Sequence, residues 1–258
     1  MKKAIIVASF GCSIKDSREK YIETVENAVK NAYKDIDCFR VFTSEIIRKK
    51  MKREEDLDIH NMTTCLQKLK EENYTHVYVC VTHVIPGFEY EKVLRAVDEY
   101  KDSFEEIKTA RTFLDDHMGE NEVNVIKSYV KSDLKYDEAV IMVGHGTEHD
   151  SHKYYGQIEK LLRKDIINIH IVSVEGNPYI DDIMDELKVK GYKRIYLYPF
   201  LIVSGDHSLN DIGSDDEESV RSKIAANEMD VEMFFTGLGE NENAVNLFVD
   251  RLSEIINI

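Results

Sequence analysis

The sequence predicts an α/β fold of two similar lobes, each with a mostly parallel sheet flanked by helices. Short apolar runs alternate with longer amphipathic stretches along the whole chain, which is the order of strand–helix units. Several runs are apolar at successive positions, as in parallel strands buried on both faces. Parts of the first half also recur in the second half. We therefore expect a duplicated fold with residues 1–132 and 133–258 as its lobes, and with a last helix able to pack back on the N-terminal lobe.

Eight short runs rich in β-branched and aromatic residues are expected as strands. In chain order they are residues 4–9, 38–42, 77–81, 107–112, 139–143, 169–174, 195–201 and 231–235. The stretches between them are expected as helices, because their apolar residues recur at spacings of three and four. The clearest of these stripes begin at Ile22, Ile180 and Val245. Asp16 and Glu19 are placed as a capping box at the start of the first helix.

A repeat within the sequence supports the two lobes. Residues 69–79 align with residues 187–197 at an offset of 118 residues. The same offset places Glu89 on His207. Chance similarity among α/β units would also produce such a match. Duplication of one α/β half explains it better and predicts a cleft between two similar lobes.

Composition and charge exclude several classes of protein. Of the 258 residues 43% are hydrophobic, which is typical of a globular chain rather than a disordered one. Lys and Arg number 34 and Asp and Glu 49, and the resulting net charge of −15 disfavours a nucleic-acid partner. The four cysteines form no CxxC pair, which indicates free thiols in a reducing compartment. No apolar run approaches the ~20 residues of a membrane span. We expect a cytoplasmic protein that binds neither nucleic acid nor membrane.

Three polar residues of the second half follow predicted strands, namely His145, Glu175 and His207. The carboxyl ends of parallel strands meet at one edge of a sheet, and ligands of open α/β sheets bind there. Two imidazoles and a carboxylate form a common open site for a divalent transition metal. Scattered polar loop residues are the alternative interpretation.

Residues that follow strands of the first half are also candidates. Phe10 stands where the second half has its glycine-flanked histidine, and it offers an aromatic face to a flat ligand or lies in the core. His83 is expected to be a satisfied core residue rather than a ligand. Glu89, which the repeat places opposite His207, could accept protons. Residues 148–152 are expected to form a solvated loop, with metal delivery as the lesser alternative. Phosphate-loop, dinucleotide and hydrolase motifs are absent, so nucleotide use has no support.

Five stretches of the chain resemble the class II tetrapyrrole chelatases, specifically the anaerobic sirohydrochlorin cobaltochelatase family. They are residues 2–11, 39–44, 87–92, 143–146 and 203–211. The resemblance spans nearly the whole chain, and its Gly-His-Gly and Gly-Asp-His motifs are fairly specific in combination. It implies two α/β lobes around a cleft that holds the macrocycle. It also implies ATP-independent insertion of Co²⁺ into sirohydrochlorin in anaerobic cobalamin biosynthesis.

The resemblance assigns roles to individual residues. It makes His145 and His207 the catalytic, metal-binding histidines and Glu175 the third metal ligand. Glu89 matches an acidic residue on the opposite wall, where it would assist in taking up the pyrrole protons. The implied substrate-binding residues are Ser9, Phe10, Gly11, Val84, Ile85 and Gly87.

Some features leave alternatives open. The chain has Cys12 where the family usually has threonine, and Phe88 where an acidic residue is common. Fe²⁺ insertion for sirohaem or haem is the nearest alternative, and Ni²⁺ is a further candidate, because a His₂Glu site does not separate these ions. A non-catalytic carrier of metal or tetrapyrrole is an alternative of another class. No cofactor is expected beyond the substrate metal. The apolar last helix fits a homo-oligomer contact as well as a core position.

Overall fold

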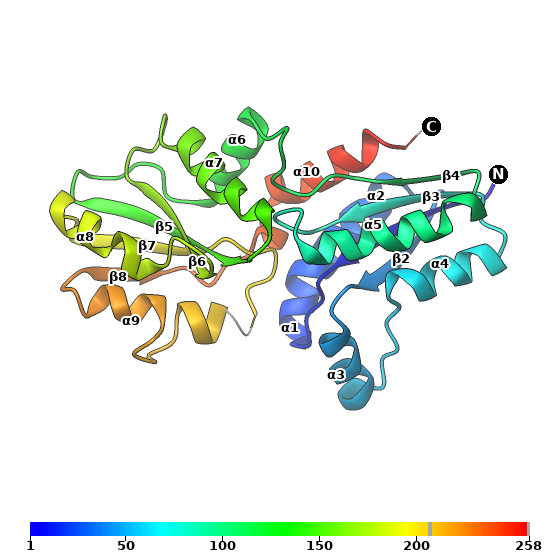
Figure 1. Cartoon of the computed structure of the whole chain (residues 1–258), viewed down its shortest axis with the longest axis horizontal. Helices are drawn as coiled ribbons and strands as arrows, with labels where there is room; N and C mark the ends of the chain where they lie inside the picture. The colour runs from blue at the N-terminus through cyan, green and yellow to red at the C-terminus, as the bar shows by residue number, and fades with distance from the viewer. Residues whose placement is uncertain (206–207, 257–258) are drawn as a thin grey trace. The chain divides into compact units, whose positions relative to one another are not determined.

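The computed structural model describes residues 1–205 and 208–256. The chain divides into two compact units, each with one four-stranded sheet (Figure 1). Unit 1 comprises Met1–Asp115 and Glu242–Ile258, and unit 2 comprises Asp116–Asn241. The first division falls at residue 115 instead of the expected 132, because helix α6 (Glu120–Tyr129) packs on a helix of unit 2.

The sheet of unit 1 is parallel throughout, with the strand order β2-β1-β3-β4. Its strands are β1 (Lys3–Ser9), β2 (Asp37–Phe42), β3 (His76–Val81) and β4 (Glu106–Thr109). The two central strands, β1 and β3, are buried along almost their whole length, as parallel strands covered on both faces are. The carboxyl ends of β1, β2 and β3 therefore meet at one edge of this sheet.

Helices cover the sheet of unit 1. They are α1 (Lys15–Ser17), a π-helical turn (Arg18–Ile22), α2 (Glu23–Ala32), α3 (Glu45–Glu55), α4 (Met62–Glu71), α5 (Phe88–Tyr100), a 3₁₀ turn (Lys101–Ser103) and α10 (Glu242–Ser253). Leu66 and Leu69 of α4 and Val93 of α5 share one apolar core with Ile6 and Val79 of the sheet. These two helices therefore cover one face of the sheet.

The last helix belongs to unit 1 although 126 residues of unit 2 precede it. Helix α10 packs on α2 and β3. The Arg251 guanidinium donates a hydrogen bond of 2.6 Å to the carbonyl of Phe113, and the rings of Phe113 and Phe248 lie 6.1 Å apart. The apolar stripe that begins at Val245 is buried there. The stripe faces the core of unit 1, which was one of the two alternatives expected for it, the other being a homo-oligomer contact.

The first helical segment begins differently from the sequence expectation. A capping box of Asp16 and Glu19 was expected, but helix α1 starts at Lys15 and its N-cap residue is Ile14. Ile14 has no side chain that can cap the helix. Asp16 instead lies in the first turn, where its negative charge favours the positive end of the helix dipole.

Unit 2 repeats the sheet of unit 1. Its strands are β5 (Glu138–Gly146), β6 (Ile169–Glu175), β7 (Arg194–Pro199) and β8 (Asp230–Met233). They are all parallel and lie in the order β6-β5-β7-β8, which is the order of unit 1 with each strand replaced by its counterpart. The duplicated α/β fold expected from the sequence is therefore confirmed. Each of the eight apolar runs overlaps one of these eight strands.

The remaining helical segments belong to unit 2. They are α6, a 3₁₀ turn (Asp150–His152), α7 (Lys153–Leu162), α8 (Ile180–Lys190), a π-helical turn (Ser208–Ile212), α9 (Val220–Ala225) and a 3₁₀ turn (Leu238–Glu240). Apolar residues of α8 and α9 share a core with Ile141, Val172 and Leu197 of the sheet. Within the described part of the chain, no helix has both the length and the apolarity needed to cross a bilayer.

Candidate functional site

Two of the three expected metal ligands lie together at the carboxyl edge of unit 2. His145 is the penultimate residue of β5, and Glu175 is the last residue of its neighbour β6. The Nδ1 atom of His145 lies 3.7 Å from an Oε2 oxygen of Glu175. The His145 side chain is 40% exposed and that of Glu175 67%, so a metal ion can reach both. His207, the third expected ligand, lies outside the described residues.

A glycine brings these two strand ends close together. Gly146 has a φ of +86°, which side chains disfavour, and its register partner on β6 is Glu175. A Cβ atom built on Gly146 would lie 1.5 Å from the carbonyl oxygen of Glu175. Any side chain at this position would therefore force the strand end away from Glu175. Gly146 therefore allows the backbones of the two strand ends to lie close together.

His152 links the loops that follow β5 and β6. The backbone N–H of Thr147 donates to Nδ1 of His152 over 3.3 Å, so a neutral ring carries its proton on Nε2. That Nε2 lies 2.6 Å from the carbonyl oxygen of Asn177, to which it can donate. Gly176 has a φ of +111°, and a Cβ there would lie 2.8 Å from the His152 ring. Residues 148–152 were expected as a solvated loop, but His152 of this loop holds the segment that follows Glu175. Gly176 is the sequence signal for the close approach of this segment to the His152 ring.

The corresponding edge of unit 1 carries the expected substrate-binding residues Ser9, Phe10 and Gly11. Ser9 is the buried last residue of β1, and its hydroxyl has no hydrogen-bond partner. The Phe10 side chain is 44% exposed, so it lies at the surface and not in the core. Gly11 has a φ of +102°, and a Cβ there would lie 2.7 Å from the ring of Phe42.

The loop between β3 and α5 carries the other expected contacts. Val84 is buried, whereas Ile85 is partly exposed. Gly87 is the N-cap residue of α5, and Glu89 lies in the first turn of this helix. One carboxylate oxygen of Glu89 pairs with Lys92, while the other, Oε2, is buried without a hydrogen-bond partner. The ion pair with Lys92 therefore engages only one of the two carboxylate oxygens of Glu89.

His83 lies in the core, as expected, but only one of its two ring nitrogens has a hydrogen-bond partner. The expectation that the ring is fully hydrogen-bonded is therefore wrong. The side chain is 9% exposed, and its Nδ1 atom has no hydrogen-bond partner. The Nε2 atom lies 3.5 Å from the hydroxyl of Thr43. Burial lowers the pKa of His83 to about 4, with a smaller raising effect from Glu89 and a lowering effect from Lys92. The imidazole is therefore neutral near neutral pH.

The two departures from the family pattern differ in their surroundings. Cys12 is buried, and its thiol lies 3.6 Å from the carbonyl oxygen of Ile14. All four cysteines are free, as expected from their spacing. The Phe88 side chain is 53% exposed at the start of α5.

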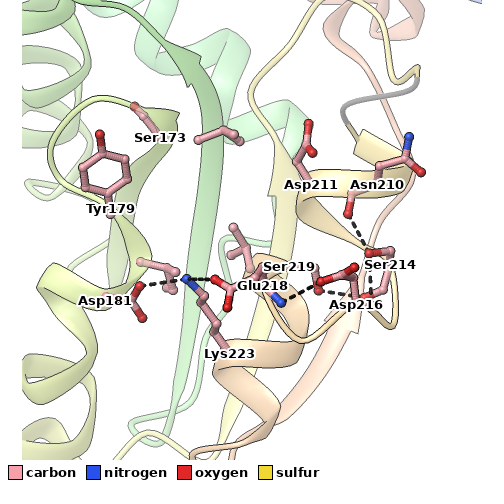
Figure 2. A pocket seen from close by; sticks show the side chains of 13 residues that line it. Ser173, Tyr179, Asp181, Asn210, Asp211, Ser214, Asp216, Glu218, Ser219 and Lys223 are labelled. Carbon is pink, nitrogen blue, oxygen red and sulfur yellow. Dashed lines mark hydrogen bonds and ion pairs between the residues drawn. The ribbon is translucent and has the colours of Figure 1, made fainter.

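Unit 2 also contains a pocket of about 680 Å³ next to β6 (Figure 2). Its residues come from the ends of β6, α8 and α9 and from the segment 210–219, and they are Ser173, Val174, Tyr179, Ile180, Asp181, Asn210, Asp211, Ser214, Asp216, Glu218, Ser219, Val220 and Lys223. The Lys223 ammonium pairs with Asp181 at 2.9 Å and with Glu218 at 3.1 Å (Figure 2). Carboxylates outnumber this one cationic side chain, so the lining disfavours a polycarboxylate ligand.

Comparison with known proteins identifies the family. The family model described as cobalt chelatase (CbiK) matches residues 3–257. The chain belongs to the cobalt chelatase (CbiK) family. The sirohydrochlorin cobaltochelatase of Salmonella typhimurium is 31% identical over 258 residues, covering 100% of this chain and 98% of the relative. The sirohydrochlorin cobaltochelatase CbiKC of Nitratidesulfovibrio vulgaris is 28% identical over 262 residues, covering 99% and 91%.

Solved structures of chelatases share the fold of this chain. SirB from Bacillus subtilis with Fe³⁺ matches with a TM-score of 0.67 at 17% identity, covering 98% of this chain and 95% of that chain. CbiX, described as the terminal enzyme for biosynthesis of siroheme in denitrifying bacteria, matches with a TM-score of 0.59 at 12% identity over 100% of both chains. At these identities the likeness concerns the fold.

Proposed function

We propose that this chain inserts Co²⁺ into sirohydrochlorin, in anaerobic cobalamin biosynthesis and without ATP. The observation that carries the proposal is the exposed pair of His145 and Glu175, whose side chains lie 3.7 Å apart at a sheet edge. An imidazole and a carboxylate are suitable ligands for a divalent first-row metal. The full-length similarity to two sirohydrochlorin cobaltochelatases supports this metal and this tetrapyrrole.

In this proposal the metal is a substrate that must be bound and then released. His145 and Glu175 supply two ligands, and His207 supplies a third. A site with three protein ligands keeps further coordination positions open, so a macrocycle nitrogen can bind before the protein ligands dissociate. Exposure of both described side chains also keeps the site accessible. No cofactor is required beyond this substrate metal.

The macrocycle must lose two N–H protons for each divalent ion that enters it. We assign the first proton to the carboxylate of Glu89, which lies in the first turn of α5. A positioned carboxylate can act as a general base in this way. The exposed ring of Phe10 and the partly exposed Ile85 offer apolar surface to the macrocycle.

The test is an anaerobic assay of the purified protein with sirohydrochlorin and Co²⁺, followed by the absorbance of the product. Many product molecules per protein molecule support an enzyme, whereas one stoichiometric burst supports a carrier. Fe²⁺ and Ni²⁺ are run beside Co²⁺, and a faster rate with Fe²⁺ would favour the sirohaem alternative. Faster insertion of Ni²⁺ would contradict the assignment of Co²⁺.

Variants test the assigned residues. His145→Ala, Glu175→Gln and His207→Ala are each expected to lose most of the turnover, because each removes one metal ligand. His60→Ala is the matched control, since His60 lies in unit 1 and bonds its own neighbour Thr64 at 3.2 Å. Wild-type rates in both His145→Ala and His207→Ala would refute the site.

A further inference from the structure

A buried arginine bonds the loop that follows β1, which comprises residues 10–14 and is called the β1 loop below. The side chain of Arg18 is only 4% exposed. Its guanidinium donates two parallel hydrogen bonds to the carboxylate of Glu55, over 3.1 and 2.7 Å, and one of 3.3 Å to the carbonyl oxygen of Cys12. A buried ion pair contributes little net stability, because the desolvation of both charges offsets their attraction. The paired, directional bonds of a guanidinium instead fix a geometry.

Helix α3 holds the β1 loop from both of its ends. At its start the backbone N–H of Ser44, the N-cap residue, donates a hydrogen bond of 3.1 Å to the carbonyl of Phe10. At its other end Glu55, the last residue of the helix, orients Arg18. Arg18 in turn holds the carbonyl of Cys12, two residues after Phe10. The backbone on the C-terminal side of Phe10 is therefore fixed through this arginine.

The β1 loop presents an aromatic ring at the carboxyl edge of the sheet in unit 1. Phe10 follows the last residue of β1 and is 44% exposed. Ligands of open parallel sheets bind at this edge. Stacking between flat rings depends on their offset and on the angle between them, so the direction of the Phe10 ring decides how well it can bind a flat ligand. Gly11 beside it lies against Phe42, since a Cβ there would lie 2.7 Å from that ring.

We propose that Arg18 is a positioning residue for tetrapyrrole binding, which fixes the Phe10 ring through the carbonyl of Cys12. This inference rests on the proposed function, in which Phe10 offers apolar surface to the macrocycle. A ring that is held in place before binding contributes affinity without the entropy cost of ordering it. Arg18 carries no proton to or from the substrate, because a guanidinium stays protonated in proteins. Its effect reaches the macrocycle only through the β1 loop.

A fluorescent reporter tests the position of the loop without any substrate. The chain contains no tryptophan, so Phe10→Trp introduces a single tryptophan into the β1 loop. Arg18→Met removes the guanidinium but keeps a long side chain that can remain buried. In the reporter protein, Arg18→Met should lower the fluorescence anisotropy and increase quenching by acrylamide, because the loop loses its bond at Cys12.

Titration with sirohydrochlorin, followed by its absorbance, measures the consequence for binding. In the chain without the reporter, Arg18→Met should raise the Kd for sirohydrochlorin roughly two- to tenfold, which corresponds to the cost of ordering one side chain on binding. The Kd for Co²⁺ without tetrapyrrole should stay at the wild-type value, because the proposed metal ligands His145 and Glu175 belong to unit 2. The kcat at saturating substrates should also be retained, since an interaction that binds ground state and transition state equally affects KM alone.

Arg163→Met is the matched control. The guanidinium of Arg163 also bonds a glutamate, Glu159, over 2.9 Å and a backbone carbonyl, that of Ile169, over 2.9 Å. Ile169 is the first residue of β6, so these bonds lie at the opposite end of that strand from Glu175. We expect this variant to lose stability as Arg18→Met does, but to keep the reporter signal and the Kd for sirohydrochlorin of the wild type. Thermal unfolding of all variants measures the stability.

A double variant shows whether Arg18 acts through Phe10. Phe10→Ala should raise the Kd for sirohydrochlorin, and adding Arg18→Met should raise it no further, because the ring that Arg18 positions is already absent. Multiplied losses would overturn the proposal. If Arg18→Met does not fold, Glu55→Gln serves as the second variant, since it leaves one of the two acceptor oxygens and should shift the reporter signal and the Kd in the same directions.

Two further results would contradict the positioning role. One is a wild-type reporter signal or a wild-type Kd for sirohydrochlorin in the folded Arg18 variant. The other is an equal rise of that Kd in Arg163→Met. A wild-type protein that does not bind sirohydrochlorin would instead refute the proposed function, so the two failures are distinguishable.

Discussion

At Gly146 the chain has no room for a side chain, and this one position sets the approach of the two strand ends that carry the proposed metal ligands. Gly146→Ala would place a methyl group against the carbonyl of Glu175 at a φ of +86°. We expect the free energy of unfolding to fall by about 1–3 kcal/mol, because the residue must adopt a strained conformation or the strands must separate. Co²⁺ binding should weaken as His145 and Glu175 move apart. Urea unfolding and calorimetric Co²⁺ titration without tetrapyrrole measure the two effects.

Gly156→Ala provides the comparison for that substitution. Gly156 lies in helix α7, and a Cβ there would have nothing within 4 Å. Alanine is the better helix former, so this change should raise stability by up to ~1 kcal/mol and leave Co²⁺ binding unchanged. Wild-type Co²⁺ affinity in Gly146→Ala would contradict the importance of the close approach.

The sequence predicts the surroundings of some residues and not of others. His145 and Glu175 could be predicted, because polar residues after adjacent buried strands must meet at a sheet edge. The state of His83 could not, because it depends on whether Thr43, 40 residues away, satisfies the ring. The structure gives a single contact of 3.5 Å on Nε2 and none on Nδ1.

Among the elements, the link through His152 joins two loops that each follow a ligand-bearing strand. His152→Ala removes the hydrogen bonds to Thr147 and Asn177. We expect Co²⁺ affinity to fall on the order of tenfold, as for other residues that orient metal ligands. The stability should fall by about 1 kcal/mol for the lost bonds. Co²⁺ titration and thermal unfolding check this expectation.

His149→Ala is the control for the loop itself. The hydrogen bonds of His149 to Thr147 and Ser151 lie within the loop after β5. Losing the bond to Ser151 should leave the segment after Glu175 in place. Equal losses of Co²⁺ affinity in His149→Ala and His152→Ala would contradict a specific role of the His152 hydrogen bonds. Such losses would show that the affinity depends on the loop after β5 as a whole.

Strands were the most predictable elements, whereas helix ends and long-range packing were not. Apolar runs buried on both faces are visible in sequence, and all eight formed strands. The capping box at Asp16 is wrong because the helix begins at Lys15, two residues earlier than an N-cap at Asp16 requires. The last helix was expected to be able to pack on the N-terminal lobe, but its apolar stripe does not indicate α2 and β3 as the partners.

For the whole molecule, the net charge of −15 acts on the two proposed substrates in opposite directions. An acidic protein attracts Co²⁺ and repels a polycarboxylate macrocycle. Raising the ionic strength shortens the Debye length from ~30 Å at 0.01 M to ~8 Å at 0.15 M. We therefore expect the KM for sirohydrochlorin to fall severalfold and the KM for Co²⁺ to rise. Initial rates in a salt with a non-coordinating anion measure both constants, and a parallel shift of the two would contradict the argument.

Acid should destabilise the molecule through its buried histidines. The folded pKa values of His83 and His170 are lowered to about 4, whereas an unfolded histidine titrates near ~6.5. Between these values the unfolded chain binds protons that the folded chain does not. Stability is therefore full above pH ~6.5 and falls towards pH 4, by at most about 1.4 kcal/mol per pH unit for each histidine. In urea unfolding at pH 7 and pH 5, His170→Asn should show a smaller pH dependence than the wild type. An unchanged dependence would contradict the lowered pKa.

The return of α10 to unit 1 has a consequence for synthesis of the chain on the ribosome. Unit 2 is one continuous segment, so it can fold as soon as residue 241 has emerged. Unit 1 cannot be completed then, although it begins at the first residue, because its β3 and α2 still await α10. The 126 residues between its two segments take roughly 6–25 s to translate at ~5–20 residues per second. During that interval the nascent N-terminal lobe exposes the surface that α10 will cover, and it becomes complete only when α10 has been made.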